Sequence, residues 1–146
     1  MLGQLGIVVT LLVLGFIFGR IAERRHYKSI IKREHEFNAL PAIASRYPPR
    51  EGHYKQQLVT GSVVVSSDYF KSFIAGLINL FGGSVVSFES LLDRARREAV
   101  LRMKAEAKEQ GAELVFNVKY ETMPLGSSRV GSVEVLAYGT ALRRGG

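Results

Sequence analysis

The sequence predicts an α+β protein, in which a small β-α-α-β-β domain follows a single transmembrane helix and a basic helical stalk. Residues 2–19 contain no charged side chain. As a helix this segment rises about 27 Å, close to the ~30 Å hydrocarbon layer of a bilayer. Residues 88–107 place apolar side chains three and four positions apart, as on one face of a helix. Residues 57–65 are rich in β-branched side chains, which indicates a strand.

The net charge of +7 is concentrated beside the apolar segment. Residues 20–36 carry six Lys and Arg against three Glu, whereas the chain from residue 56 onward is nearly balanced. This distribution favours an anionic membrane surface as the partner, and no nucleic-acid partner is expected, since that would require a basic face on the domain itself. The chain has no cysteine, which excludes disulfides and thiol chemistry.

Residues 1–19 are predicted to be a membrane anchor rather than a cleaved signal peptide. A signal peptide has basic residues before its apolar run and a small-residue cleavage site after it, and neither pattern is present. The basic residues follow the run, so the positive-inside rule places the N-terminus outside and the folded domain in the cytoplasm, at the inner or plasma membrane. The side chains expected to contact lipid tails are Leu5, Ile7, Val8, Leu11, Leu12, Leu14, Phe16 and Phe18. Those expected at anionic headgroups are Arg20, Arg24, Arg25 and Lys28.

Two glycines of this segment, Gly15 and Gly19, form a GxxxG pattern. Such a pattern allows two membrane helices to approach closely. Glycine is also simply common in membrane helices, so both interpretations stay open.

Residues 20–37 are predicted to continue the helix as a basic stalk, and residues 38–56 to form a linker rich in turn-forming and extended residues. The three histidines, His26, His35 and His53, all lie in these two segments. Their spacing does not stack them on neighbouring helix turns, and no cysteine accompanies them. We therefore predict no metal ligands and interpret them as surface residues.

Residues 57–144 form the predicted domain. After the first strand, a short apolar helix over residues 70–81 ends at a glycine pair, and the long helix ends near Gly111. Residues 114–120 alternate, with Leu114, Phe116, Val118 and Tyr120 on one face. A turn over residues 123–128 leads to a last strand over residues 130–142. Gly61 indicates a bulge or a close backbone approach. The glycines expected to have structural roles are Gly61, Gly82, Gly83, Gly111 and Gly139.

The short helix is more apolar than one layer of three strands and one helix can cover. Burial between subunits explains this excess and predicts a homo-oligomer. The residues expected at the interface are Phe70, Phe73, Ile74, Gly76, Leu77, Leu80 and Phe81.

A series of short motifs occurs in order between residues 58 and 143. They are Val59-Thr-Gly61, Ala75-Gly76, Gly82-Gly83, Phe88-Glu89, Ala95-Arg96, Ala107, Gly111-Ala112 and Val135-Leu-Ala-Tyr-Gly-Thr-Ala141. In these the domain resembles the YbjQ-like family, known as a heavy-metal-binding domain family. The resemblance implies a small dodecin-like α+β subunit that assembles as a ring, usually a pentamer. The anchor and the basic stalk are additions to that pattern.

We therefore expect a non-enzymatic, membrane-anchored, homo-oligomeric scaffold or binding module, with membrane lipids and further copies of itself as partners. No catalytic residue and no cofactor site is predicted, because residues 58–143 contain neither His nor Cys. The alternative is a metal or small-ligand binding protein with sites between subunits. Its hard ligands would be the carboxylates Glu89, Asp93, Glu113, Glu121 and Glu134.

Overall fold

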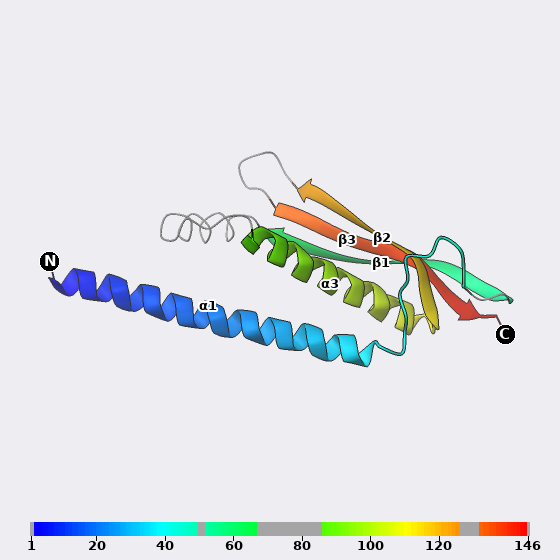
Figure 1. The fold of residues 1–146 in the computed structure, drawn as a ribbon, viewed down its shortest axis with the longest axis horizontal. Coiled ribbons are helices and arrows are strands. Elements are labelled where there is room, and N and C mark those ends of the chain that lie inside the picture. Colours follow the sequence, from blue (N-terminus) through cyan, green and yellow to red (C-terminus); the bar gives the residue numbers. More distant parts are fainter. Residues whose placement is uncertain (1, 50–51, 67–85, 126–131, 146) are drawn as a thin grey trace. The chain divides into compact units, whose positions relative to one another are not determined.

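The computed structural model describes residues 2–49, 52–66, 86–125 and 132–145 (Figure 1). The chain divides into two compact units, Met1–His35 and Glu36–Gly146. The short helix predicted over residues 70–81 lies outside the described residues, as do Gly82 and Gly83.

The first unit is built from helix α1, Leu2–Glu36. The helix runs without interruption from the apolar segment through the basic segment, and no proline occurs before residue 41. Thr10, a polar residue within the apolar part, donates its hydroxyl to the carbonyl of Gly6 at 2.8 Å. By length and composition, α1 is long and apolar enough from Gly6 onward to cross a membrane. The hydroxyl of this threonine therefore has its hydrogen-bond partner within the helix.

The second unit contains a three-stranded antiparallel sheet in the order β1-β3-β2. The strands are β1, Tyr54–Ser66, β2, Leu114–Leu125, and β3, Ser132–Arg144. Two are longer than predicted. Strand β1 begins inside the predicted linker because it pairs with β3 along the whole length of that strand. Strand β2 continues through the first half of the predicted turn, because it pairs with β3 as far as Ser132. Pro124 is tolerated in β2 because this strand lies at an edge of the sheet.

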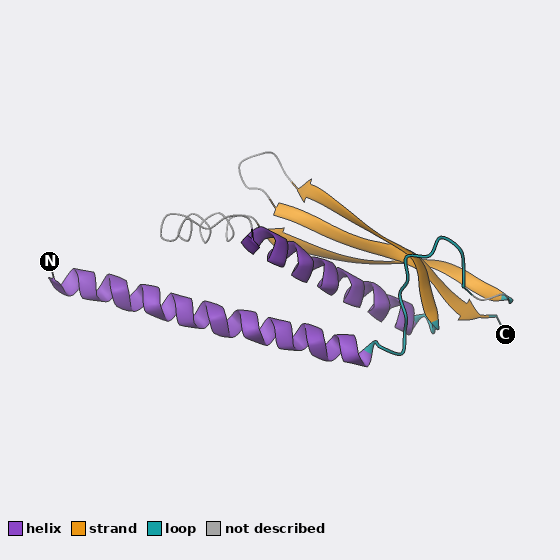
Figure 2. Cartoon of the chain, in the orientation of Figure 1, coloured by secondary structure: helices purple, strands orange, loops and turns teal. Residues whose placement is uncertain are grey.

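Helix α3, Val86–Glu109, covers one face of this sheet (Figure 2). The predicted apolar stripe supplies its buried side, although the side chains of Phe88 and Leu91 lie outside the described residues. The buried core of this layer consists of Leu40, Val59, Ala95, Ala99, Met103, Ala107, Val115, Val135, Ala137 and Ala141. The helix contributes mainly alanines, so its backbone lies close to the sheet.

Gly61 marks the closest contact between α3 and β1. A Cβ atom at this position would overlap the carbonyl oxygen of Ala99 and the amide nitrogen of Met103. Both are backbone atoms of a packed helix and cannot move aside cheaply. Of the two interpretations drawn from the sequence, the structure shows the close approach, and β1 pairs with β3 through Gly61 without a shift of register.

Helix α3 ends in a Schellman motif. The amide of Ala112 donates to the carbonyl of Ala107, and that of Gly111 donates to Lys108, each at 3.0 Å. Gly111 has a φ of +71°, in the left-handed region that glycine adopts without strain.

A β-bulge at Asn117 overturns the alternation predicted for residues 114–120. The register with β3 shifts between Phe116 and Lys119, and Asn117 adopts a φ of +53°. The bulge places Val118 on the same face as Val115, packed against the core under α3. Leu114 and Phe116 instead form a second small cluster with Leu142 on the other face. One extra residue in a strand reverses every side chain after it.

Gly139 lies opposite this bulge on β3. A Cβ there would come within 2.8 Å of Val115 Cγ1 and 3.1 Å of the Phe116 carbonyl oxygen. The missing side chain therefore makes room for β2 just before the bulge.

Part of the predicted linker pairs with the sheet. Residues 37–45, here called the strap, lie along the outer edge of β2, and Ala42 forms a parallel bridge with Val115. In the described part of the chain, four backbone hydrogen bonds of 2.9–3.1 Å join the strap to residues 115–118 of β2. Leu40 is only 6% exposed and belongs to the core. The pairing of this segment with β2 is a non-local interaction, so the turn-forming composition of the segment did not predict it.

Candidate functional site

The apolar side chains predicted to anchor the protein are exposed along α1. Seven of them, from Ile7 to Phe18, are between 43 and 68% exposed, and the side chain of Leu5 lies outside the described residues. Such a band of large apolar side chains is unusual on a surface that faces water. A helix that spans a membrane presents a surface of this kind to lipid.

The predicted headgroup residues follow this band directly. Arg20, Arg24, Arg25 and Lys28 are all exposed. The guanidinium of Arg20 lies 5.3 Å from the centroid of the Phe16 ring, within the range of a cation–π contact. This contact positions a positive charge at the end of the apolar segment, where it can reach an anionic headgroup.

The residues predicted for the oligomer interface all fall in residues 70–81. They lie outside the described residues, so this prediction remains untested.

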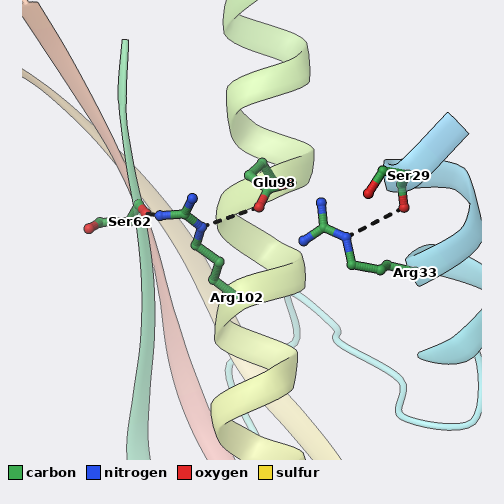
Figure 3. Close-up of polar contacts among 5 residues, drawn as sticks. All are labelled: Ser29, Arg33, Ser62, Glu98 and Arg102. Carbon is green, nitrogen blue, oxygen red and sulfur yellow. Dashed lines mark hydrogen bonds and ion pairs between the residues drawn. The ribbon is translucent and has the colours of Figure 1, made fainter. Parts of the chain in front are cut away.

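A polar cluster on α3 holds the outer edge of β1 (Figure 3). Arg102 donates from Nη1 to the carbonyl of Ser62 at 2.8 Å and pairs through Nε with Glu98 at 3.2 Å. One turn further along α3, Glu106 accepts the amide proton of Thr60 at 2.8 Å. Both backbone groups point away from β3, so α3 provides partners that an edge strand otherwise lacks.

Sequence reasoning found only part of this cluster. Helical spacing predicts the pair of Glu98 and Arg102, but the contacts of Arg102 and Glu106 with β1 depend on how the helix lies on the sheet. The signal that was available is Gly61, between the two strand residues concerned, because a glycine that admits a helix backbone also brings the side chains of that helix to the strand.

Two lysines of α3 hold the beginning of the strap. Lys104 Nζ lies 3.5 Å from the carbonyl oxygen of Phe37, and Lys108 Nζ lies 5.4 Å from the centroid of its ring. The strap is thus attached to α3 at its beginning and to β2 further along.

Comparison with known proteins gives a consistent result for the second unit. Residues 47–144 match the YbjQ family model, described as "Putative heavy-metal-binding". A UPF0145 protein of Archaeoglobus fulgidus is 40% identical over 96 residues, covering 66% of this chain and 86% of the relative. A UPF0145 protein of Dehalococcoides mccartyi is 39% identical over 85 residues, which cover 58% of this chain and 79% of the relative. A solved structure of a DUF74-family protein of unknown function from Pediococcus pentosaceus is 16% identical, covers 70% of this chain and 95% of its own, and has a TM-score of 0.39.

The donor set does not fit the metal that the family description suggests. The sequence contains no cysteine, and its three histidines all precede β1. Within the described ranges, no group of three or more His, Asp or Glu side chains converges on one point. Glu113, one of the carboxylates considered as a ligand, pairs with Arg144 at 3.4 Å. Soft heavy metals prefer thiolate and imidazole ligands, and the described residues from β1 onward offer neither.

Proposed function

Because the chain belongs to the YbjQ family, we propose that it is a non-enzymatic scaffold, anchored in the membrane by α1, whose family domain self-associates on the cytoplasmic face. The observation that carries this proposal is the composition of α1. An uncharged apolar segment of membrane-spanning length is followed directly by exposed basic residues, in one unbroken helix.

The distribution of apolar and charged residues along α1 supports a membrane span rather than a surface attachment. An interfacial helix has a polar face along its entire length. In α1 the apolar side chains from Ile7 to Phe18 are exposed all round, and the charged residues begin only at Arg20. The basic flank favours a cytoplasmic location for the domain that follows it.

Self-association is supported by the apolar character of residues 70–81 and by membership of the family. Within a membrane, several anchors on one oligomer would raise the overall affinity for the bilayer through high effective concentration. The proposed activity is therefore display, in which many copies of one domain are held at a membrane surface.

Membrane topology is the direct test, and the absence of native cysteine makes it simple. We expect Gly3→Cys to react with a membrane-impermeant maleimide in spheroplasts. Glu121→Cys, which places the thiol at an exposed position of β2, should react only after permeabilisation. Recovery of the chain in the soluble fraction, or labelling of both variants in intact spheroplasts, would contradict the proposal.

Self-association is tested separately by cross-linking in native membranes and by native mass spectrometry of the extracted protein. Leu77→Asp places a charge in the predicted interface and should disperse the oligomer. Ser72→Asp adds the same charge to the same segment at a position not predicted to contact another subunit, and should leave the oligomer intact. An unchanged oligomer in the Leu77→Asp variant would refute this interface.

A further inference from the structure

Strands β1 and β3 extend beyond the end of α3, and a hollow lies at that point. Lys55 pairs with Arg143 and Gln57 with Ala141 in the register of the two strands. Because alternate residues share a face, these four lie on the same face as Val59, which α3 covers. The helix ends at Glu109, before it reaches them. The hollow has a volume of about 220 Å³ and is lined by Lys55 and Arg143, by three glutamines and by two alanines.

Two cations line this hollow side by side. Lys55 and Arg143 are directly opposite on neighbouring strands, an arrangement in which like charges repel. Among the described residues that line the hollow there is no Asp or Glu. Arg143 Nη1 lies 3.5 Å from the carbonyl oxygen of Gln110, at the C-terminal end of α3. The next residue, Arg144, lies on the other face and has an acidic partner in Glu113.

Gln110, which also lines the hollow, has a buried acceptor that lacks a donor. Its Nε2 donates to Glu106 Oε1 at 3.3 Å, and Glu106 Oε2 in turn accepts the amide of Thr60. A carboxylate accepts only, so this contact fixes which end of the amide is nitrogen. The remaining atom, Gln110 Oε1, is buried and has no hydrogen-bond partner among the described residues. A buried acceptor without a donor is costly and requires an explanation.

We propose that this hollow binds inorganic phosphate. The anionic oxygens would lie between Lys55 and Arg143, whose guanidinium suits a tetrahedral oxyanion. Phosphate keeps a hydroxyl proton at neutral pH and can donate it to Gln110 Oε1. The hollow is smaller than the ~300–1,000 Å³ typical of sites for larger organic ligands. Every group involved belongs to one copy of the domain, so the site requires neither the membrane nor self-association.

Sulfate provides the sharpest probe of this proposal. It has the size and charge of phosphate but no proton to donate at neutral pH. A site with an acceptor to satisfy discriminates strongly against a ligand without the matching donor. We therefore expect the full chain in neutral detergent at low ionic strength to bind radiolabelled phosphate saturably in equilibrium dialysis, with one phosphate per chain. Sulfate should compete at least about tenfold less well.

Three charge variants locate the site. Arg143→Gln and Lys55→Gln should each weaken phosphate binding by about tenfold, since each removes a charge-assisted hydrogen bond. Arg144→Gln is the matched control, because it removes the same charge from the neighbouring residue on the opposite face, and it should leave binding unchanged. Equal losses in the Arg143 and Arg144 variants would show that net charge alone is responsible and would overturn the proposal.

The role of Gln110 is tested by Gln110→Met, which removes the acceptor. We expect this variant to bind phosphate and sulfate equally. The thermal unfolding transition of this variant shows whether it remains folded. The comparison of phosphate with sulfate in the unchanged protein tests the role of the Gln110 acceptor without any substitution. Absence of saturable phosphate binding at millimolar concentration, or equal affinity of the unchanged protein for the two anions, would refute the site.

Discussion

The two edges of the sheet are protected by different kinds of partner. At the β1 edge, side chains of α3 satisfy single backbone groups, with Glu106 accepting from Thr60 and Arg102 donating to Ser62. At the β2 edge, the backbone of the strap satisfies several groups in succession, and its side chains enter the core. An unprotected edge strand is a template for pairing with another chain. Part of each edge is therefore covered, one by charged side chains and the other by a segment that precedes the family match.

The contacts at the two edges differ in how deeply they are buried. Arg102 is 55% exposed, so its interactions are weakened by solvent and salt. The strap is held by Leu40, which is nearly buried, and by hydrogen bonds within a ladder. We therefore expect disruption of the strap to cost more stability than disruption of the side-chain contacts at β1.

The largest effect should come from Gly61→Val, at the contact that brings α3 to the β1 edge. The new side chain would collide with the backbone of α3 near Ala99 and Met103. Overpacking of this kind costs about 3 kcal/mol or more when backbone must move. Thermal unfolding followed by circular dichroism should show a large fall in Tm. Gly15→Val is the matched control, since a Cβ there meets nothing within 4 Å, and a similar fall in that variant would contradict the explanation.

Next in size is Leu40→Ala, which weakens the strap. Truncation of a buried leucine costs about 2–5 kcal/mol, and the lower part of that range is expected at this peripheral site. Leu58→Ala makes the same change at a residue that is 64% exposed and should alter the free energy of unfolding by no more than about 0.5 kcal/mol. Equal effects of the two substitutions in chemical denaturation would show that the strap does not contribute to the core.

A smaller effect on stability is expected for Arg102→Leu, at about 1 kcal/mol. The variant loses the hydrogen bond to Ser62 and the ion pair with the largely buried Glu98. It also exposes the β1 edge, so faster aggregation at unchanged concentration should accompany the loss, measured by light scattering. Arg96→Leu, at an exposed position of the same helix, should leave both quantities nearly unchanged. Similar aggregation of the two variants would point to added hydrophobicity rather than an unprotected edge.

Effects no larger than this are expected at Asn117, whose bulge allows β2 to bond the strap. Asn117→Ala should destabilise the domain by about 1 kcal/mol, because alanine is strained at a φ of +53°. Asn117→Gly should be within about 0.5 kcal/mol of the unchanged protein, since relief of strain offsets the greater freedom of the unfolded chain. If alanine were tolerated as well as glycine, the bulge would have to differ from the one described.

The comparison of the edges also shows which parts of the fold are local. The apolar stripe and the Gly111 terminus of α3 follow from the sequence because helical spacing and helix capping involve residues four or five positions apart. The bulge does not, because Leu114, Val115 and Phe116 are all apolar and fit either register. An asparagine after three apolar residues was the available signal, since asparagine tolerates the left-handed conformation.

The proposed phosphate site was beyond sequence reasoning for the same reason. Lys55 and Arg143 are 88 positions apart in the chain, and only the register of β1 with β3 makes them neighbours. Helix α1 is the opposite case, because the composition of one continuous segment predicts a helix there. Helices that depend on one continuous segment could be predicted, whereas features that depend on strand pairing required the structure.

The strap has a mechanical consequence for a domain proposed to be tethered at a membrane. Tension that enters the domain along the chain from α1 reaches residues 37–45 before it reaches β1. Before β1 bears any load, the hydrogen bonds between the strap and β2 must break. Leu40 must also leave the core. The strap would act as strain relief, so that lateral movement of the anchor does not pull directly on the sheet.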